Sequence, residues 1–157
     1  MVPASALSWH RVRLPAGLGR HGAKLQAALQ GHARAQHNYA FCLQNGTGVA
    51  RNLTEAIRWY RLSAEQKNQF AYHSLGYCYQ HGVGVPWNDA EAVRWYQLSA
   101  ELKHAPAQLS LGFCYRHGLG VERDHKMAFH WYKQAADQLN PQGMNSVGYC
   151  YEEGLGV

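Results

Sequence analysis

The chain has 157 residues, 46% of them hydrophobic, which suits one folded domain with a continuous core. Its formal charge of +5 is unevenly spread: residues 1–54 hold 6 of the 15 basic and none of the 10 acidic residues, which leaves 9 basic and 10 acidic residues in 55–157. Nucleic-acid binding requires basic residues clustered along the folded surface, so this near-neutral body argues against that class of protein.

Residues 1–30 are predicted to form a basic, largely irregular tail. Prolines and glycines interrupt any amphipathic helix in this stretch. They are Pro3, Pro15, Gly17, Gly19 and Gly22. The opening residues lack the charged start and apolar core of a secretion signal, whereas a basic, acid-free stretch that contains serine is typical of mitochondrial transit peptides. A mitochondrial location is therefore one alternative. No apolar run in the chain is long enough for a transmembrane helix.

One ten-residue pattern recurs every 36 residues. The copy at 76–85 reads Gly-Tyr-Cys-Tyr-Gln-His-Gly-Val-Gly-Val, and the other copies begin at Ala40, Gly112 and Gly148. A fixed period of this length predicts a solenoid, in which each unit buries its apolar face only against its neighbours. We therefore predict an all-α repeat domain over residues 31–157. Its units are 31–66, 67–102, 103–138 and a partial unit, 139–157.

The second unit illustrates how the first half of a repeat folds. Ala71, Leu75 and Tyr79 lie on one side of a predicted helix, because they are spaced four residues apart. Gly82 can adopt the left-handed conformation of a carboxyl-terminal cap, and Pro86 prevents the helix from continuing. The first helix of each unit is therefore expected to end at the glycine loop.

A second helix is predicted after each glycine loop. Asn88 is a suitable N-cap, and Glu91 three residues later predicts a capping box. The two helices can approach closely at Gly76, and Trp95 and Tyr96 are expected to fill the space beside it. Helices this short are marginal alone, so stacking must stabilise them. The predicted spans are 33–45, 53–66, 69–81, 89–102, 105–117, 125–138 and 141–153.

Residues 71–101 and 107–136 carry, almost unbroken, the pattern Ala-x3-Leu-Gly-x2-Tyr-x2-Gly-x-Gly-Val, followed by Ala-x2-Trp-Tyr-x3-Ala-Ala/Glu. This pattern resembles the Sel1-like repeat, a relative of the tetratricopeptide repeat (TPR), and the resemblance covers residues 33–157. It implies a right-handed α-solenoid that binds proteins or peptides. Relatives serve as adaptors in ubiquitin-ligase complexes or as chitin synthase activators. The residue between units, often glycine in the family, is here Gly31, Lys67, Lys103 and Leu139.

The cysteines Cys42, Cys78, Cys114 and Cys150 occur once per repeat. Metal sites need ligands at short spacings such as Cys-x2-Cys. Equivalent points on stacked helices lie roughly 8–10 Å apart, whereas a disulfide needs Cα atoms within about 7 Å. We predict free, partly buried thiols, no metal, no cofactor and a reducing compartment, cytoplasmic or mitochondrial. Cysteine-rich Sel1-like relatives carry two cysteines per repeat, whereas this chain carries one. The resemblance to those relatives therefore does not extend to the cysteines.

The histidines and glycines of the repeats are interpreted as structural. His32 and His104 share an inter-repeat position with Asn68, where residues that tolerate positive φ are useful. His81 and His117 share a position at the mouth of the glycine loops. The Gly-x-Gly pairs do not predict a nucleotide site, because a dinucleotide fingerprint needs a strand before its glycines.

The other side of each first helix carries the candidate binding site. Because Leu75 and Tyr79 face inward, His73, Tyr77 and Gln80 are expected to point roughly the opposite way. An aromatic ring recurs there every 36 residues, and exposed aromatic anchors are typical of peptide-binding surfaces. The candidate residues are Phe41, His73, Tyr77, Gln80, Phe113, Arg116 and Tyr149. The alternative is that these rings pack between adjacent first helices.

Together these features predict a non-catalytic scaffold or adaptor that binds a protein or peptide on the concave face of the solenoid. One alternative is a hydrolase similar to the cysteine-rich relatives, although no acid-base pair or nucleophile arrangement is evident. Another is a spacer segment of a larger adaptor. The helix predicted at 141–153 has no second helix to pack on it, so self-association through this end is also expected.

Overall fold

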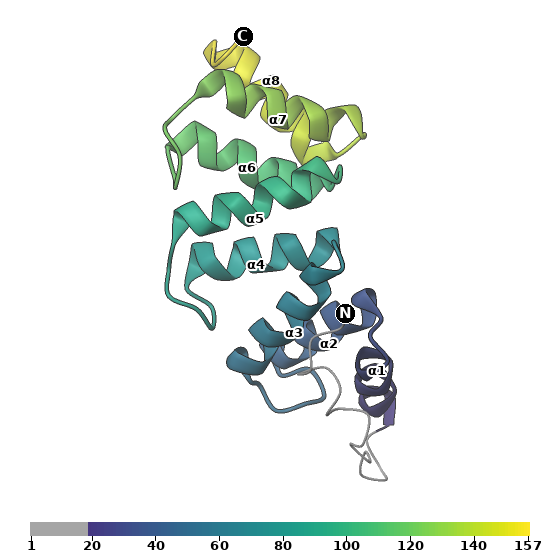
Figure 1. Cartoon of the computed structure of the whole chain (residues 1–157). Helices are drawn as coiled ribbons and strands as arrows, with labels where there is room; N and C mark the ends of the chain where they lie inside the picture. The colour runs from purple at the N-terminus through teal and green to yellow at the C-terminus, as the bar shows by residue number, and fades with distance from the viewer. Residues whose placement is uncertain (1–18) are drawn as a thin grey trace. The chain divides into compact units, whose positions relative to one another are not determined.

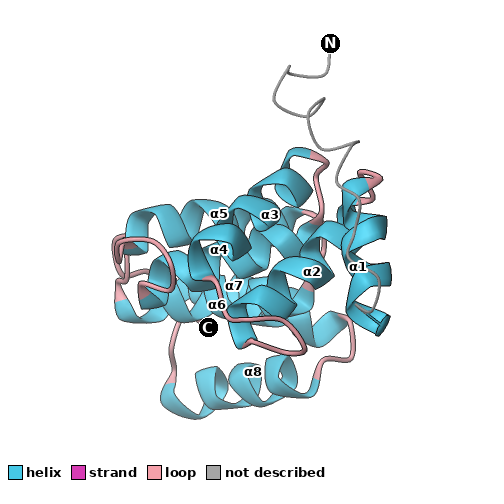
Figure 2. Ribbon diagram, turned by 90° about the horizontal axis from the view of Figure 1, so that it is seen from below, coloured by secondary structure: helices cyan, strands magenta, loops and turns pink. Residues whose placement is uncertain are grey.

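The computed structural model describes residues 19–157, and within them the chain forms eight α-helices and no strand (Figure 2). The helices are α1 (Gly19–Leu29), α2 (Ala33–Asn45), α3 (Leu53–Glu65), α4 (Gln69–His81), α5 (Asp89–Glu101), α6 (Ala105–His117), α7 (His125–Asp137) and α8 (Pro141–Glu153). The predicted all-α repeat fold is confirmed, and each predicted helix from residue 33 onward agrees to within one residue. We call α2, α4, α6 and α8 the first helices and α3, α5 and α7 the second helices.

The expectation that residues 1–30 are largely irregular is wrong for residues 19–29, which form α1. The glycines in this stretch disfavour a helix, but packing of α1 against α2 outweighs that preference. Ala28 is buried at this contact, and its carbonyl accepts a hydrogen bond from Gln36 Nε2 at 3.4 Å. The expectations for residues 1–18, including the transit-peptide interpretation, lie outside the described residues.

The described residues divide after Gln66 into two compact bodies, 19–66 and 67–157, which we call the N-terminal body and the C-terminal body. In the N-terminal body, α2 packs against both α1 and α3. In the C-terminal body, each helix from α4 to α8 packs on the next one in the chain, and Figure 1 shows these helices as a stack. Besides α1, the described part of the chain thus holds three complete hairpins and one first helix, α8.

The glycine loops close each hairpin as predicted. At the end of α4, Gly82 has a φ of 64°, and its N–H donates to the Cys78 carbonyl. The second glycine of the loop after α6, Gly120, also has a positive φ, 68°, and it permits close packing as well, because a Cβ there would collide with the backbone of Asp89 and Ala90 at the start of α5. The Gly-x-Gly pairs are therefore structural turns.

The second helices begin at side-chain caps. Asn88 Oδ1 accepts a hydrogen bond from the Glu91 N–H at 3.0 Å, as predicted. The reciprocal half of the predicted capping box is replaced, because the Asn88 N–H donates to the Tyr79 carbonyl at 2.9 Å. The Glu91 carboxylate instead lies 2.8 Å from Arg94 Nη1. Backbone contact with the preceding helix thus takes over the bond that Glu91 was expected to make.

In the inter-repeat turns, the conformation of two histidines differs from the one expected. His32 and His104 were expected at a position that favours positive φ, but their φ values are −71° and −76°, and they are N-caps. The left-handed residue is the one before. It is Gly31, Lys67, Lys103 or Leu139, with φ values of 86°, 58°, 61° and 59°. Lysine and leucine therefore keep the backbone conformation for which the family often uses glycine.

The core of each hairpin centres on one tyrosine of the second helix. Tyr96 is 1% exposed, and a Cβ added to Gly76 would lie only 2.5 Å from Tyr96 Cδ1. Gly112 is equally close to Tyr132, with a corresponding distance of 2.6 Å to Cε1. The predicted close approach at these glycines is confirmed, but tyrosine is the buried member of the Trp-Tyr pair and Trp95 is only half-buried.

Candidate functional site

A row of exposed aromatic rings lies on the first helices of the C-terminal body. Tyr77 on α4, Phe113 on α6 and Tyr149 on α8 are 44%, 46% and 38% exposed. In the N-terminal body, Phe41 on α2 is also exposed. The inward residue Leu75, two positions before Tyr77, is completely buried. The sequence pattern therefore placed Leu75 and Tyr77 on opposite sides of α4, one buried and the other exposed.

Each ring of the row has a cationic or imidazole neighbour. The Tyr77 and His81 rings have centroids 4.3 Å apart, and the Phe113 and His117 rings have the same separation. The Arg116 guanidinium lies 4.2 Å from the centre of the Tyr149 ring, a cation–π geometry that links α6 to α8. These contacts restrict the rings while leaving much of each ring exposed.

The polar members of the predicted site lie between helices. The Tyr96 hydroxyl donates to Gln80 Oε1 at 2.8 Å, and Gln80 Nε2 lies 3.7 Å from Cys114 Sγ. The His73 ring lies 5.5 Å from the Tyr96 ring, and His73 Nε2 is 3.4 Å from Ser110 Oγ. These side chains are half-buried and have structural partners, so the aromatic rings form the more accessible part of the predicted set.

Arg116 lies next to both an exposed ring and a core tyrosine. It occupies the repeat position of Gln80. Desolvation raises the pKa of Tyr132, and the nearby Arg116 guanidinium partly offsets that rise. The same guanidinium packs over the Tyr149 ring. Arg116 therefore connects a core tyrosine to the exposed row, which a helical pattern cannot predict.

Sequence reasoning missed exposed hydrophobic residues that are not repeated. Trp87, in the loop before α5, is 67% exposed, and its equivalents Arg51 and Arg123 are not aromatic. Phe70 at the start of α4 is 37% exposed, and its ring lies 5.1 Å from the His104 ring. A comparison of single residues with the repeat consensus could have revealed both.

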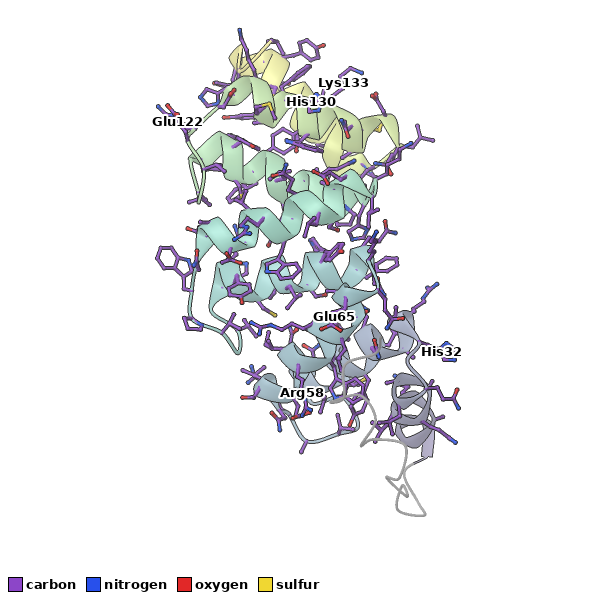
Figure 3. All side chains as sticks on the ribbon, in the orientation of Figure 1. His32, Arg58, Glu65, Glu122, His130 and Lys133 are labelled. Atoms are coloured by element: carbon purple, nitrogen blue, oxygen red, sulfur yellow. The ribbon has the colours of Figure 1, made fainter. Side chains whose placement is uncertain are left out.

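Acidic residues are unevenly divided between the first helices and the second helices. Helices α2, α4 and α6 contain no aspartate or glutamate, whereas α3, α5 and α7 each contain at least one. Glu65 lies at the end of α3, and Glu122 lies in the loop between α6 and α7 (Figure 3). The surface around Tyr77 and Phe113 therefore has no acidic residue from its own helices.

The cysteines are buried, free thiols, as predicted. Desolvation raises the pKa of the Cys78 and Cys114 thiols to about 12, and burial also raises the pKa of Cys150. Because the thiolate is the nucleophile, these thiols are poorly suited to covalent chemistry. Among residues 19–157, no three His, Cys, Asp or Glu side chains gather as they would to hold a metal ion. No helix in that range is both long and apolar enough to span a membrane.

A family comparison supports the repeat assignment. The family model described as Sel1 repeat matches residues 33–68, 69–104, 105–138 and 141–157. Among curated proteins, no relative matches the chain significantly.

Solved structures resemble the chain in both sequence and fold. A protective antigen of uropathogenic Escherichia coli with an SLR fold is 39% identical, with a TM-score of 0.81 over 85% of this chain and 29% of its own. A Sel1 repeat protein from Oxalobacter formigenes is 34% identical, with a TM-score of 0.80 over 87% of this chain and 55% of its own. The chain therefore spans about a third and about half the length of these two relatives.

A third structure resembles the chain in fold alone. Helicobacter pylori cysteine rich protein B is 16% identical, with a TM-score of 0.69 over 83% of this chain and 97% of its own. This likeness supports the arrangement of helical repeats.

Proposed function

Because the chain belongs to the Sel1 repeat family, we propose that it is a non-catalytic scaffold that binds a protein or peptide through the aromatic row on its first helices. The family fold is generally a protein–protein interaction scaffold. The observation that carries the proposal is the exposure of Tyr77, Phe113 and Tyr149, which lie on the side opposite the buried core.

The row has the physical properties of a peptide-binding surface. Buried aromatic side chains contribute strongly to interfaces because each covers a large apolar area. His81 and His117 already restrict the rings of Tyr77 and Phe113, so less side-chain entropy is lost on binding. The absence of acidic residues from α4 and α6 favours a ligand that is neutral or acidic next to these rings.

The hydrolase alternative is less well supported. The thiols of Cys78 and Cys114 are buried and their pKa is raised to about 12, which disfavours a nucleophilic role. The third relative described above, a cysteine rich protein, shares only the fold with this chain. A scaffold accounts better for an exposed row of repeated aromatic side chains than a hydrolase does.

A peptide-display selection against the purified chain tests the proposal. Peptides selected on the chain are measured by fluorescence anisotropy against the variant with Tyr77→Ala and Phe113→Ala. We expect affinity to fall at least about tenfold, the loss expected when one or two aromatic anchors are removed.

A matched control replaces two hydrophobic residues of similar exposure elsewhere. Leu98 and Leu102, in and just after α5, are 42% and 44% exposed. The variant with Leu98→Ala and Leu102→Ala is expected to bind the selected peptides as the unmodified chain does. Equal binding by both double variants, or an equal loss in both, would contradict the proposed site.

A further inference from the structure

The aromatic row repeats one arrangement of two rings on neighbouring first helices. On α4, the Tyr77 and His81 rings have centroids 4.3 Å apart and planes inclined by 48°. On α6, the Phe113 and His117 rings have the same centroid separation and an inclination of 47°. All four side chains are exposed. A surface that repeats in this way favours a ligand whose side chains repeat with the same spacing.

Side-chain contacts between the first helices indicate the spacing of the row. Gln80 Nε2 on α4 lies 3.7 Å from Cys114 Sγ on α6. The Arg116 guanidinium on α6 lies 4.2 Å from the centre of the Tyr149 ring on α8. The axes of packed helices lie roughly 8–10 Å apart, so rings at equivalent positions on these helices recur at about that distance.

Among regular peptide conformations, polyproline II matches this spacing best. It has three residues per turn, so every third side chain returns to the same face after about 9.3 Å. In a β-strand, the side chains on one face recur after only about 6.7 Å. In an α-helix, the side chains seven residues apart share a face at about 10.5 Å, beyond this range. A polyproline II peptide can therefore place one side chain on each ring of the row.

The charge next to the row places a second requirement on the ligand. Helices α4 and α6 contain no aspartate or glutamate. His81 lies in the last turn of α4, and Arg116 and His117 lie in the last turn of α6. Imidazole and guanidinium groups donate hydrogen bonds to carboxylates, and these bonds are stronger than those between neutral groups when both partners are charged. Carboxylates of the ligand are thus favoured beside these helices.

Helix α8 differs in charge from α4 and α6. Glu152 and Glu153 occupy the repeat positions of Arg116 and His117. Like charges disfavour an acidic residue of the ligand at this helix. The carboxylates of the ligand are therefore expected next to the rings of α4 and α6, and the apolar side chain that contacts α8 is expected without one.

We propose that the aromatic row binds an acidic peptide in the polyproline II conformation, in which an apolar side chain recurs at every third residue. The apolar side chains contact successive rings of the row, and the carboxylates accept hydrogen bonds from His81 and His117. Proline between the apolar residues holds the peptide in this conformation before it binds, so less entropy is lost. This inference rests on the proposed function, because it names the ligand of the same row.

The probe is a fluorescently labelled synthetic peptide, Leu-Pro-Glu-Leu-Pro-Glu-Leu-Pro. Its three leucines match the three rings of the C-terminal body, and its two glutamates match the two imidazoles. The control peptide has the same composition, but its leucines recur at every second residue. We expect fluorescence anisotropy to show saturable binding of the probe and at least about tenfold weaker binding of the control, because its leucines cannot meet successive rings.

A second comparison tests the charge. A peptide with glutamine in place of both glutamates is expected to bind roughly two- to fivefold more weakly than the probe, the usual effect of exposed charge pairs. The matching variant of the chain carries His81→Asn and His117→Asn. Asparagine already occupies this repeat position as Asn45 in α2, so the helix ends are expected to remain intact. In this variant, the preference for glutamate over glutamine should be reduced.

The variant with Tyr77→Ala and Phe113→Ala shows where the probe binds. It is expected to bind the probe at least about tenfold more weakly than the unmodified chain, because two of three ring contacts are lost. Equal binding would place the probe elsewhere on the chain and would contradict the inference.

Three further outcomes would overturn this inference. They are absence of saturable binding of the probe, equal binding of the control peptide, and an equal preference for glutamate in the double histidine variant. The proposed function fails separately, if peptides selected by display bind without Tyr77 and Phe113. Selected peptides that require both rings but lack the three-residue spacing would support the proposed function and contradict the inference.

Discussion

The effect of a glycine in these repeats depends on what lies opposite it. Gly76 and Gly148 occupy the same repeat position, two units apart. A Cβ on Gly76 would lie 2.5 Å from the Tyr96 ring, whereas a Cβ on Gly148 would have no atom within 4 Å apart from its own helix. The same substitution at the two positions therefore separates steric effects from helix propensity.

We predict opposite effects for leucine at these two positions. Gly76→Leu should lower the free energy of unfolding by at least about 1–3 kcal/mol, because it overpacks the contact with Tyr96. Gly148→Leu should leave the free energy of unfolding unchanged or raise it by up to about 0.8 kcal/mol, because leucine favours a helix more than glycine does. Urea unfolding measures both values, and effects of equal sign and size would contradict the packing described for Gly76.

The buried thiols predict how stability depends on pH. The pKa of Cys78 and Cys114 is about 12 in the folded chain, raised from 9.0 by desolvation. As pH rises above about 9, thiols of the unfolded chain lose protons that the folded chain retains, so the free energy of unfolding falls with pH. Urea unfolding at about pH 8 and about pH 10 should show this loss.

The double variant with Cys78→Ala and Cys114→Ala provides the control for this effect. Its stability should depend less on pH over the same range, because two of the groups responsible are missing. A pH dependence equal to that of the unmodified chain would show that other groups, such as buried tyrosines, cause the effect.

At the scale of single helices, the caps fix where each second helix begins. Asn88 makes two hydrogen bonds. Its side chain accepts one from the Glu91 N–H, and its backbone N–H donates one to the Tyr79 carbonyl. The Glu91 carboxylate contributes only an exposed pair with Arg94. The cap residue therefore matters more than the residue that was expected to complete a capping box.

We predict that Asn88→Ala lowers the free energy of unfolding by about 1 kcal/mol, the usual cost of losing an N-cap. Glu91→Ala should cost less than about 0.5 kcal/mol, because exposed ion pairs contribute little. Thermal or urea unfolding of the two single variants distinguishes them. A larger loss for Glu91→Ala would show that the reciprocal bond of the capping box forms in solution.

For the chain as a whole, the repeat period predicted the fold because it determines which residues can pack together. Seven helices followed from the spacing of apolar residues and from glycine and asparagine at the helix ends. Helix α1 did not, because it lacks the repeat pattern and depends on a tertiary contact through Ala28. Periodicity can detect repeated elements but cannot detect an element stabilised by a single contact.

Only part of the candidate site could be predicted, because the repeat pattern identifies repeated positions on a single helix. Helical spacing correctly placed Tyr77 and Phe113 on the exposed side. It could not show that Gln80 accepts a hydrogen bond from Tyr96, because that contact joins two helices. Trp87 was missed because it occurs in only one loop. Partners across helices and unrepeated side chains are the features that a repeat pattern leaves undetermined.

The division between core tyrosines and exposed rings is tested most directly by urea unfolding of three single variants and one double variant. Tyr96→Ala should lower the free energy of unfolding by about 3–5 kcal/mol, because it removes a large buried side chain. Tyr77→Ala and Phe113→Ala, alone or combined, should cost less than about 1 kcal/mol, because surface substitutions change stability little. A loss for the Tyr77 and Phe113 variants as large as that for Tyr96→Ala would show that these rings are packing residues and not a binding surface.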